Sequence, residues 1–216
     1  MRNFQVKIVC VEETMHSTGS GCTYDDMRSM KNQNYDGIDR LTGLYNGEYA
    51  LKEIQAYMEQ NPECTAAVYI MDIDNFRTVD ETLGRLFGNE IMKEIAAAIC
   101  QVFRKQAVIG RIGGDKFLIF EKNYESVGRI RENAKELCHR ARSTFKGEDQ
   151  NFVISLSIGI AIMPDDGYEW KQLAQHATQA LTYVKNHGKD GYEFYNSEMD
   201  TVDEPADAWM QKNKSL

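Results

Sequence analysis

The strongest constraint on the fold is the order in which apolar segments follow one another between residues 38 and 196. Stretches with a period of 3.6 residues, typical of helices with one buried face, alternate with short apolar runs typical of buried strands. The alternation is broken once, where only small residues separate two strand-like runs. We expect helices over 48–60, 89–105, 125–145 and 169–186, and strands over 65–71, 107–112, 116–120, 152–162 and 192–195.

The break is the segment Arg111-Ile112-Gly113-Gly114-Asp115-Lys116-Phe117, whose paired glycines favour a hairpin. A hairpin joins antiparallel strands, so the order favours an antiparallel or mixed sheet with helices packed on it. We predict an α+β fold, a ferredoxin-like palm with a βααββαβ core and a central, mostly antiparallel sheet flanked by helices. Segment 152–162 alternates large and small side chains, which predicts a central strand with a helix packed closely on its small side.

The sequence outside this patterned region has a different character. Residues 1–37 contain one alternating stretch followed by polar sequence, and we interpret them as an N-terminal arm or the stub of an upstream sensor or linker. Residues 38–196 form the patterned domain. Residues 197–216 form a polar, acidic tail that we expect to be flexible.

The composition excludes several classes of function. The formal net charge is −8, whereas a protein that holds nucleic acid by neutralising phosphates needs a positive surface. No apolar run approaches the roughly 20 residues that span a bilayer, and the N-terminus lacks the apolar centre of a signal peptide. The five cysteines form no metal-binding CxxC pair, which favours reduced thiols. We therefore expect a cytoplasmic protein with no nucleic-acid partner and no membrane segment in this chain.

Two groups of carboxylates stand where they can do chemistry. Asp72 and Asp74 directly follow the apolar run 65–71, and residues two apart in a strand share a face. Such carboxylates are oxygen ligands suited to Mg²⁺; the alternative is that Asp74 caps the next turn and Asp72 is a solvated strand end. Asp115 follows the paired glycines, which let a backbone approach a phosphate closely; the alternative is an ordinary turn.

Five segments, in this order, resemble the motifs of the GGDEF family of diguanylate cyclases over roughly residues 38–196. They are Asp39-Arg40-Leu41-Thr42-Gly43-Leu44-Tyr45-Asn46, Asp72-Ile73-Asp74-Asn75-Phe76-Arg77, Arg111-Ile112-Gly113-Gly114-Asp115-Lys116-Phe117, Ser155-Leu156-Ser157-Ile158-Gly159-Ile160-Ala161 and Ala180-Leu181-Thr182-Tyr183-Val184-Lys185-Asn186-His187-Gly188-Lys189. In this bacterial signalling family, two domains face each other and join two GTP molecules into cyclic di-GMP, with metal ions activating the attacking hydroxyl. The resemblance implies a palm-like fold, GTP as ligand, Mg²⁺ or Mn²⁺ as cofactor and a homodimer for activity.

The resemblance also assigns roles to residues of this chain. Asp72, the carbonyl of Ile73 and Asp115 would hold the metal, and Asp115 and Lys116 occupy the catalytic positions. The implied nucleotide-binding residues are Asn75, Phe76, Arg77, Asp80, Asn89, Gly113, Gly114, Lys185 and Lys189.

The sequence departs from the family pattern at several of these positions. Lys116 stands where the family has Glu, which places an ammonium beside the metal position; the alternative is that this ammonium binds phosphate and partly replaces a metal. Asp80 and Asn89, which would read the guanine base, carry the family's two residue types in exchanged order. Of the inhibitory product site only Arg104 remains, because Ala107 replaces its Asp, and we expect that site to be lost.

These departures lead to three hypotheses. The first is a degenerate GGDEF domain of cyclic di-GMP signalling with weak or no cyclase activity, acting as a GTP-binding or protein-interaction module towards a signalling partner. The second is an active diguanylate cyclase that tolerates Lys116. The third and weakest is a cyclase with an altered base preference, because of the exchange at Asp80 and Asn89.

Overall fold

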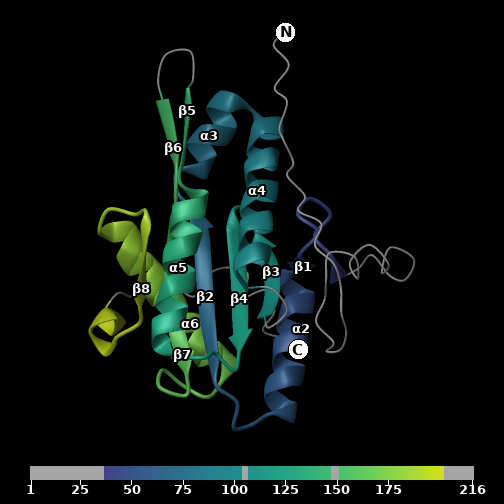
Figure 1. The fold of residues 1–216 in the computed structure, drawn as a ribbon, viewed down its shortest axis with the longest axis vertical. Helices are drawn as coiled ribbons and strands as arrows, with labels where there is room; N and C mark the ends of the chain where they lie inside the picture. Colours follow the sequence, from purple (N-terminus) through teal and green to yellow (C-terminus); the bar gives the residue numbers. More distant parts are fainter. Residues whose placement is uncertain (1–36, 104–106, 147–150, 202–216) are drawn as a thin grey trace.

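A computed structural model describes residues 37–103, 107–146 and 151–201 (Figure 1). Arg104, most of the N-terminal arm and the tail beyond residue 201 lie outside these residues. The helices are α2 (Gly47–Gln60), α3 (Phe76–Leu83), α4 (Arg85–Phe103), α5 (Val127–Ala141), α6 (Trp170–Asn186) and the 3₁₀ helix η4 (Ser197–Thr201). The strands are β1 (Tyr45–Asn46), β2 (Ala66–Ile73), β3 (Ala107–Gly113), β4 (Lys116–Lys122), β5 (Ser143–Lys146), β6 (Asn151–Ile154), β7 (Leu156–Met163) and β8 (Gly191–Phe194).

The main sheet has six strands in the order β1-β3-β4-β2-β7-β8. The four central strands are mutually antiparallel, whereas the edge strands β1 and β8 lie parallel to β3 and β7. The central strands and the helices between them follow one another as β2-α3-α4-β3-β4-α5-β7, which is the predicted βααββαβ order. The α+β palm is therefore confirmed, including its mostly antiparallel sheet.

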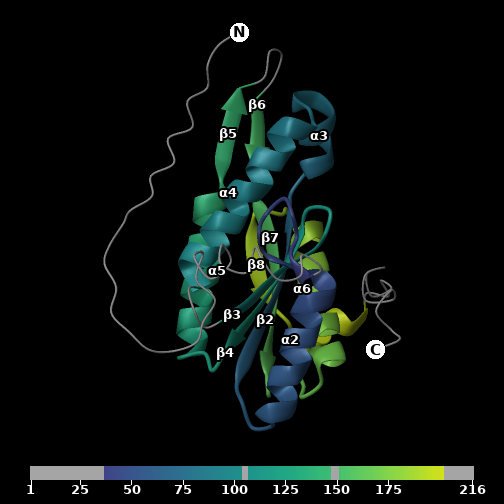
Figure 2. The same cartoon turned by 90° about the vertical axis from the view of Figure 1, so that its right-hand side faces the viewer.

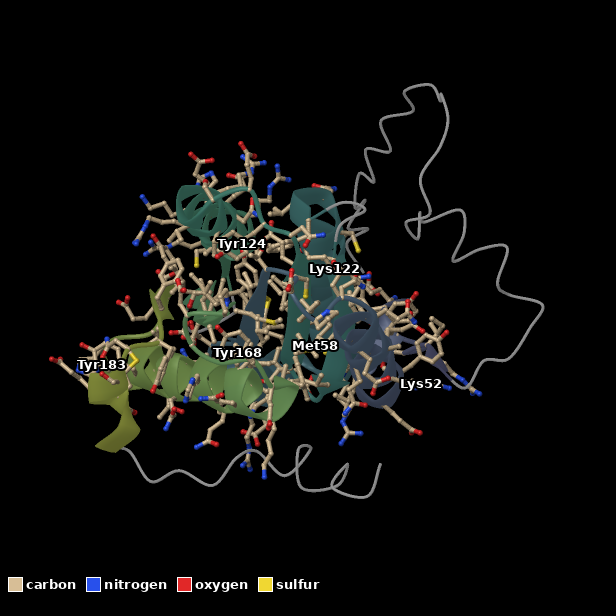
Figure 3. The ribbon with its side chains drawn as sticks, turned by 90° about the horizontal axis from the view of Figure 1, so that it is seen from below. Lys52, Met58, Lys122, Tyr124, Tyr168 and Tyr183 are labelled. Carbon is tan, nitrogen blue, oxygen red and sulfur yellow. The ribbon has the colours of Figure 1, made fainter. Side chains whose placement is uncertain are left out.

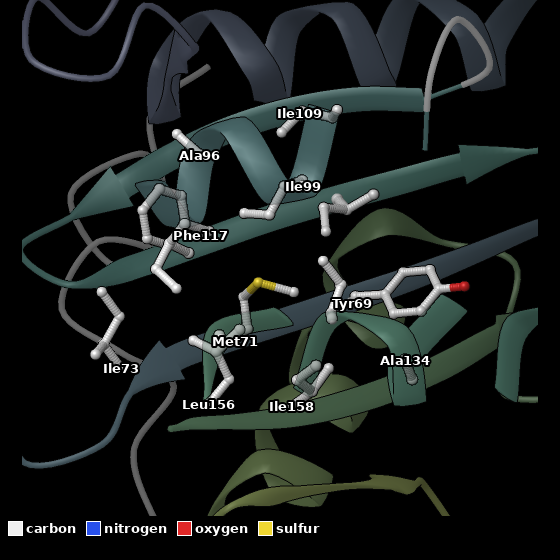
Figure 4. Packing of buried hydrophobic residues seen from close by; sticks show 14 of the residues in the cluster. Tyr69, Met71, Ile73, Ala96, Ile99, Ile109, Phe117, Ala134, Leu156 and Ile158 are labelled. Atoms are coloured by element: carbon white, nitrogen blue, oxygen red, sulfur yellow. The ribbon is translucent and has the colours of Figure 1, made fainter. Parts of the chain in front are cut away.

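Helices cover both faces of the sheet. Figure 2 shows α4 and α5 on one side and α2 and α6 on the other. Side chains alternate along β2, so Tyr69 and Met71 pack towards α4 and α5 (Figure 4), whereas Val68 and Ile70 pack towards α2 and α6. Because both faces are covered, every residue of β2 is buried, including Asp72 near its carboxyl end.

The large and small sides of β7 are arranged as predicted. Ile158 and Ile160 pack into the cluster with α4 and α5, and Gly159 lies on the opposite side against α6. A Cβ at Gly159 would lie 2.0 Å from the carbonyl oxygen of Ala177 and 2.2 Å from the amide nitrogen of Leu181. The glycine therefore permits α6 to approach β7, which brings the end of α6 to the end of β2.

Two predicted boundaries are wrong. The helix expected over 125–145 ends at Ala141, where the amide of Arg142 donates to the carbonyl of Cys138, and residues 143–146 form β5 instead. The strand expected over 152–162 is divided at Ser155 into β6 and β7, and β6 pairs with β5 as a second, two-stranded sheet. Aromatic and β-branched residues in both segments favour this pairing over a longer helix.

The other predicted helices and strands are present with shifts of their ends, whereas β1, α3 and η4 had no predicted range. Asn46 caps α2, because its side chain accepts a hydrogen bond of 2.9 Å from the amide of Tyr49. Helix α4 begins at Arg85 rather than at Asn89. Within the three described ranges, no helix is long and apolar enough to cross a lipid bilayer.

Candidate functional site

The chemistry-bearing residues meet where β2 ends, beside the β3–β4 hairpin and the carboxyl end of α6. Asp72 on β2 lies directly opposite Lys116 on β4, and the ammonium of Lys185 on α6 lies 2.8 Å from the Asp72 carboxylate. Just beyond β2, Lys189 donates a 2.7 Å hydrogen bond to the side-chain carbonyl of Asn75. The structure thus brings together residues that are more than a hundred positions apart in the chain. Figure 3 shows the opposite end of the molecule, with Lys122, Tyr124 and Tyr168.

Asp72 is a buried carboxylate flanked by positive charge. Only 6% of the residue is exposed. Burial is the largest influence and raises the pKa of Asp72, and the Asp115 charge raises it further, while the ammonium groups of Lys185 and Lys116 lower it. The net pKa is raised, so the two lysines only partly offset the cost of burying this charge.

Asp74 comes just after β2 and lies on the same face of the sheet as Asp72, as strand alternation predicts, because its carboxylate contacts Ser157, the residue of β7 that pairs with Asp72. Strand β2 ends at Ile73, and the carboxylate of Asp74, only 2% exposed, is directed at β7. It accepts 2.6 Å hydrogen bonds from the hydroxyls of Ser155 and Ser157 and a 3.0 Å bond from the amide of Asp190. Asp74 therefore fastens the end of β2 to the start of β7 and to the loop after α6.

The loop after β2 leads directly into α3. Asn75 has a left-handed backbone, with φ of +56°, and precedes Phe76 and Arg77 in the first turn of the helix. The amides of a first helical turn lack acceptors within the helix and are suited to anions. Arg77, by contrast, extends along α3 and pairs with Glu81 at 2.8 Å, with 91% of its side chain exposed. Lys189, rather than Arg77, is the cation that contacts this loop.

The hairpin turn is fixed by a cation that received no role in the sequence analysis. Gly113 and Gly114 both have positive φ, as the turn requires. The guanidinium of Arg111 donates two hydrogen bonds to the carbonyl of Gly114, at 2.9 and 2.7 Å, and pairs with Asp39 at 3.1 Å. Both residues lie in the motifs quoted above, which was the available signal. Together they tie the Gly-Gly turn to the loop that begins the domain.

Comparison with known proteins shows the family of this chain. The family model for the diguanylate cyclase GGDEF domain matches residues 37–191. The chain belongs to the GGDEF family. Among related proteins, the bifunctional diguanylate cyclase/cyclic di-GMP phosphodiesterase MucR of Pseudomonas aeruginosa is 33% identical over 163 residues, and the signaling protein YkoW of Bacillus subtilis is 28% identical over 161 residues. These matches cover 74% and 73% of this chain, which spans only 24% and 20% of the relatives.

Solved structures share the fold. The GGDEF domain of TpbB (YfiN) from Pseudomonas aeruginosa superposes with a TM-score of 0.69 at 22% identity, covering 76% of this chain and 96% of that one. The GGDEF domain of DgcB from Caulobacter crescentus, solved with c-di-GMP, superposes with a TM-score of 0.64 at 22% identity, covering 75% of this chain and 97% of that one.

The metal position of this GGDEF domain has suitable donors but an unsuitable charge. The carboxylates of Asp72 and Asp115 and the carbonyl of Ile73 are oxygen ligands of the kind that Mg²⁺ takes. The ammonium of Lys185 forms an ion pair with the Asp72 carboxylate, and Lys116 lies opposite Asp72 on β4. Two positive charges therefore balance the two carboxylates. At about 4 Å and an effective dielectric near 20, each pair of unit charges is worth roughly 4 kcal/mol. The residues present do not fit a divalent cation, and within the described ranges no cluster of three His, Cys, Asp or Glu side chains could hold one.

The two positions to which the resemblance assigns reading of the base lie on neighbouring helices. Asp80 is on α3 and Asn89 on α4, and both are half-buried. A Cβ at Gly88 would lie 2.4 Å from the Asp80 carboxylate, so that carboxylate rests against the turn of α4 that carries Asn89. The exchange of residue types therefore keeps one carboxylate and one amide in the same small region. Ala107, which stands where the resemblance places the Asp of a product site, is the first residue of β3.

Acid should weaken the link between Asp39 and Arg111. Burial alone would raise the pKa of Asp39, but hydrogen bonds from Thr42 and the Arg111 charge outweigh it, so the pKa lies below 3.8. A lowered pKa stabilises the fold above 3.8, and this contribution is lost as pH falls through the folded-state pKa. We expect Asp39→Asn to lower the free energy of unfolding by about 1–2 kcal/mol at pH 6, and the difference from the parent chain to shrink at pH 3. Urea unfolding at both pH values measures this.

The exposed residue Glu59 provides the control for this pH experiment. Glu59→Gln removes one exposed carboxylate on α2 that takes no part in the contact between Asp39 and Arg111. Its effect on the free energy of unfolding should be small at both pH values. A deficit of Asp39→Asn that stayed constant or grew between pH 6 and pH 3 would contradict the expectation.

Proposed function

We propose that this chain is a regulatory GGDEF domain of cyclic di-GMP signalling, which binds GTP but forms little or no cyclic di-GMP. The observation that carries the proposal is the position of Lys116, directly opposite Asp72 on the neighbouring strand, with Lys185 on the same carboxylate. Relatives support the signalling context, since they are named both as cyclases and, like PdeR of Escherichia coli, as cyclic di-GMP phosphodiesterases.

The cationic groups at this site favour binding over turnover. Lys116, Lys185 and Lys189 present ammonium groups, which donate hydrogen bonds and attract phosphate oxygens. Formation of cyclic di-GMP requires a proton to leave the attacking hydroxyl, and an ammonium has no lone pair with which to take it. The Glu that the family carries at this position is missing from the chain. The site can therefore hold a nucleotide while lacking the group that helps it react.

The regulatory role implies a partner that senses whether nucleotide is bound. The diguanylate cyclase SiaD of Pseudomonas aeruginosa, a structural neighbour with a TM-score of 0.66 at 23% identity, was solved in complex with its activator SiaC. By analogy we place a signalling protein, or a second GGDEF domain, as the partner of this chain. We place the domain in the cytoplasm, where GTP is available.

Binding and turnover can be measured separately. Calorimetry with GTP should show binding, and chromatography after incubation with GTP and Mg²⁺ or Mn²⁺ should show no cyclic di-GMP above a mock control. Clear product would overturn the proposal in favour of an active cyclase. Absence of any nucleotide binding would leave only a protein-interaction role. Tighter binding of ATP than of GTP would show that the exchange at Asp80 and Asn89 has altered the base preference.

A further inference from the structure

The charges around Asp72 suggest how a nucleotide is held in this domain. Four charged groups converge there: the carboxylates of Asp72 and Asp115 and the ammonium groups of Lys116 and Lys185. A divalent cation at this position would have to displace the 2.8 Å ion pair between Lys185 and Asp72 and would lie close to a second ammonium. The two ammonium groups therefore already balance the charge of the two carboxylates, as a bound divalent cation would.

We infer that the ammonium groups of Lys116 and Lys185 take the place of a divalent cation, so that GTP binds this domain without Mg²⁺. The inference rests on the proposed function, because it describes how the same site binds its ligand. The lysines are suitably placed for this. The side chain of Lys185 is 33% exposed, so it can contact a ligand as well as Asp72. Lys189 adds a third ammonium on Asn75, beside the start of α3.

Strand register and helix packing give these lysines their positions. Lys116 is the first residue of β4 and pairs with Asp72 in the antiparallel register, so the two side chains lie on the same face of the sheet. Lys185 reaches that face from the last turn of α6, which packs closely on β7 through Gly159. Neither placement depends on a bound metal, because strand pairing and helix packing determine both.

The test compares the affinity for GTP in excess Mg²⁺ with that in excess EDTA. For the parent chain we expect equal or tighter binding in EDTA, since free GTP carries more negative charge towards the lysines than its Mg²⁺ complex does. Binding that requires Mg²⁺ would overturn this inference while leaving the proposed function intact. No binding in either condition would overturn the proposed function itself, so the two failures are distinguishable.

Variants at position 116 sharpen the test. Lys116→Glu should make binding depend on metal, with EDTA weakening the affinity for GTP by about tenfold or more. It should also bind Mn²⁺ alone, which the parent chain should not, and calorimetry with Mn²⁺ and no nucleotide measures this directly. Lys116→Gln keeps a side chain of similar length without charge, and it serves as the test if Lys116→Glu fails to fold. It should weaken the metal-free binding of GTP. Metal-free affinity that is unchanged in Lys116→Gln would count against the inference.

Lys171 offers a matched control for the change of charge. It is exposed near the start of α6, fourteen residues before Lys185 and thus about 21 Å away along the helix. Lys171→Glu makes the same change in net charge, and should leave the affinity for GTP unchanged with Mg²⁺ and with EDTA. A metal requirement in this variant would show that net charge, rather than position 116, controls binding.

Discussion

Replacing Lys116 by Glu should raise the production of cyclic di-GMP by on the order of a hundredfold or more. The substitution reverses the charge directly opposite Asp72, beside Asp115. Each pair of unit charges at about 4 Å is worth roughly 4 kcal/mol at an effective dielectric near 20, and every 1.36 kcal/mol of barrier corresponds to about tenfold in rate. Even after solvent screening, a few kcal/mol remain available. Chromatography of products from GTP with Mg²⁺ or Mn²⁺ gives the rate.

The control for this gain of activity is again Lys171→Glu, which should produce no more cyclic di-GMP than the parent chain. If Lys116→Glu folds, binds GTP and still forms no product, Lys116 is not what limits the reaction. The limiting change would then lie elsewhere, with the exchanged pair Asp80 and Asn89 as the next positions to restore. Asp80→Asn combined with Asn89→Asp would test them, because it restores the family's order of residue types.

The fold was accessible from the sequence because its main signals are local. The period of α2, α4 and α6, the burial of β2 and the Gly-Gly turn between β3 and β4 each depend on neighbouring residues. The pairing of β5 with β6, as of Thr144 with Val153, was missed because the helical pattern before it extends through Phe145. Local periodicity carries no information about such a partner.

The site was accessible only in part, for the same reason. The motifs indicated Asp72, Asp115, Lys116 and Lys185, but the sequence carries no signal that Lys185 neutralises Asp72 from the end of another helix. The pairing of Arg111 with Asp39 is equally non-local. Strand periodicity predicted that Asp72 and Asp74 share a face, but it carried no signal that the hydroxyls of Ser155 and Ser157 hold the Asp74 carboxylate.

The contrast between Asp74 and Asp72 leads to an expected difference in stability. Asp74→Ala should lower the free energy of unfolding by about 3 kcal/mol or more, because it leaves the hydroxyls of Ser155 and Ser157 and the amide of Asp190 without their acceptor. For a chain of this length that corresponds to a fall in Tm of roughly 6–12 °C. Asp72→Ala should cost less than about 1 kcal/mol, since burial already penalises that charge and Lys185 can turn to solvent. Thermal and urea unfolding of both variants measure the difference.

The two variants should also differ in how each change affects the binding of GTP. Asp72→Ala removes the carboxylate that Lys185 pairs with and frees that ammonium for a phosphate, so metal-free binding of GTP should be kept or strengthened. Asp74→Ala loosens the loop in which Asp190 adjoins Lys189, so its effect on binding should follow from lost structure. A large loss of stability in Asp72→Ala with little loss in Asp74→Ala would contradict this assignment. It would mean that the carboxylate at the strand end is the structural one, and that the cation balance inferred for Asp72 is wrong.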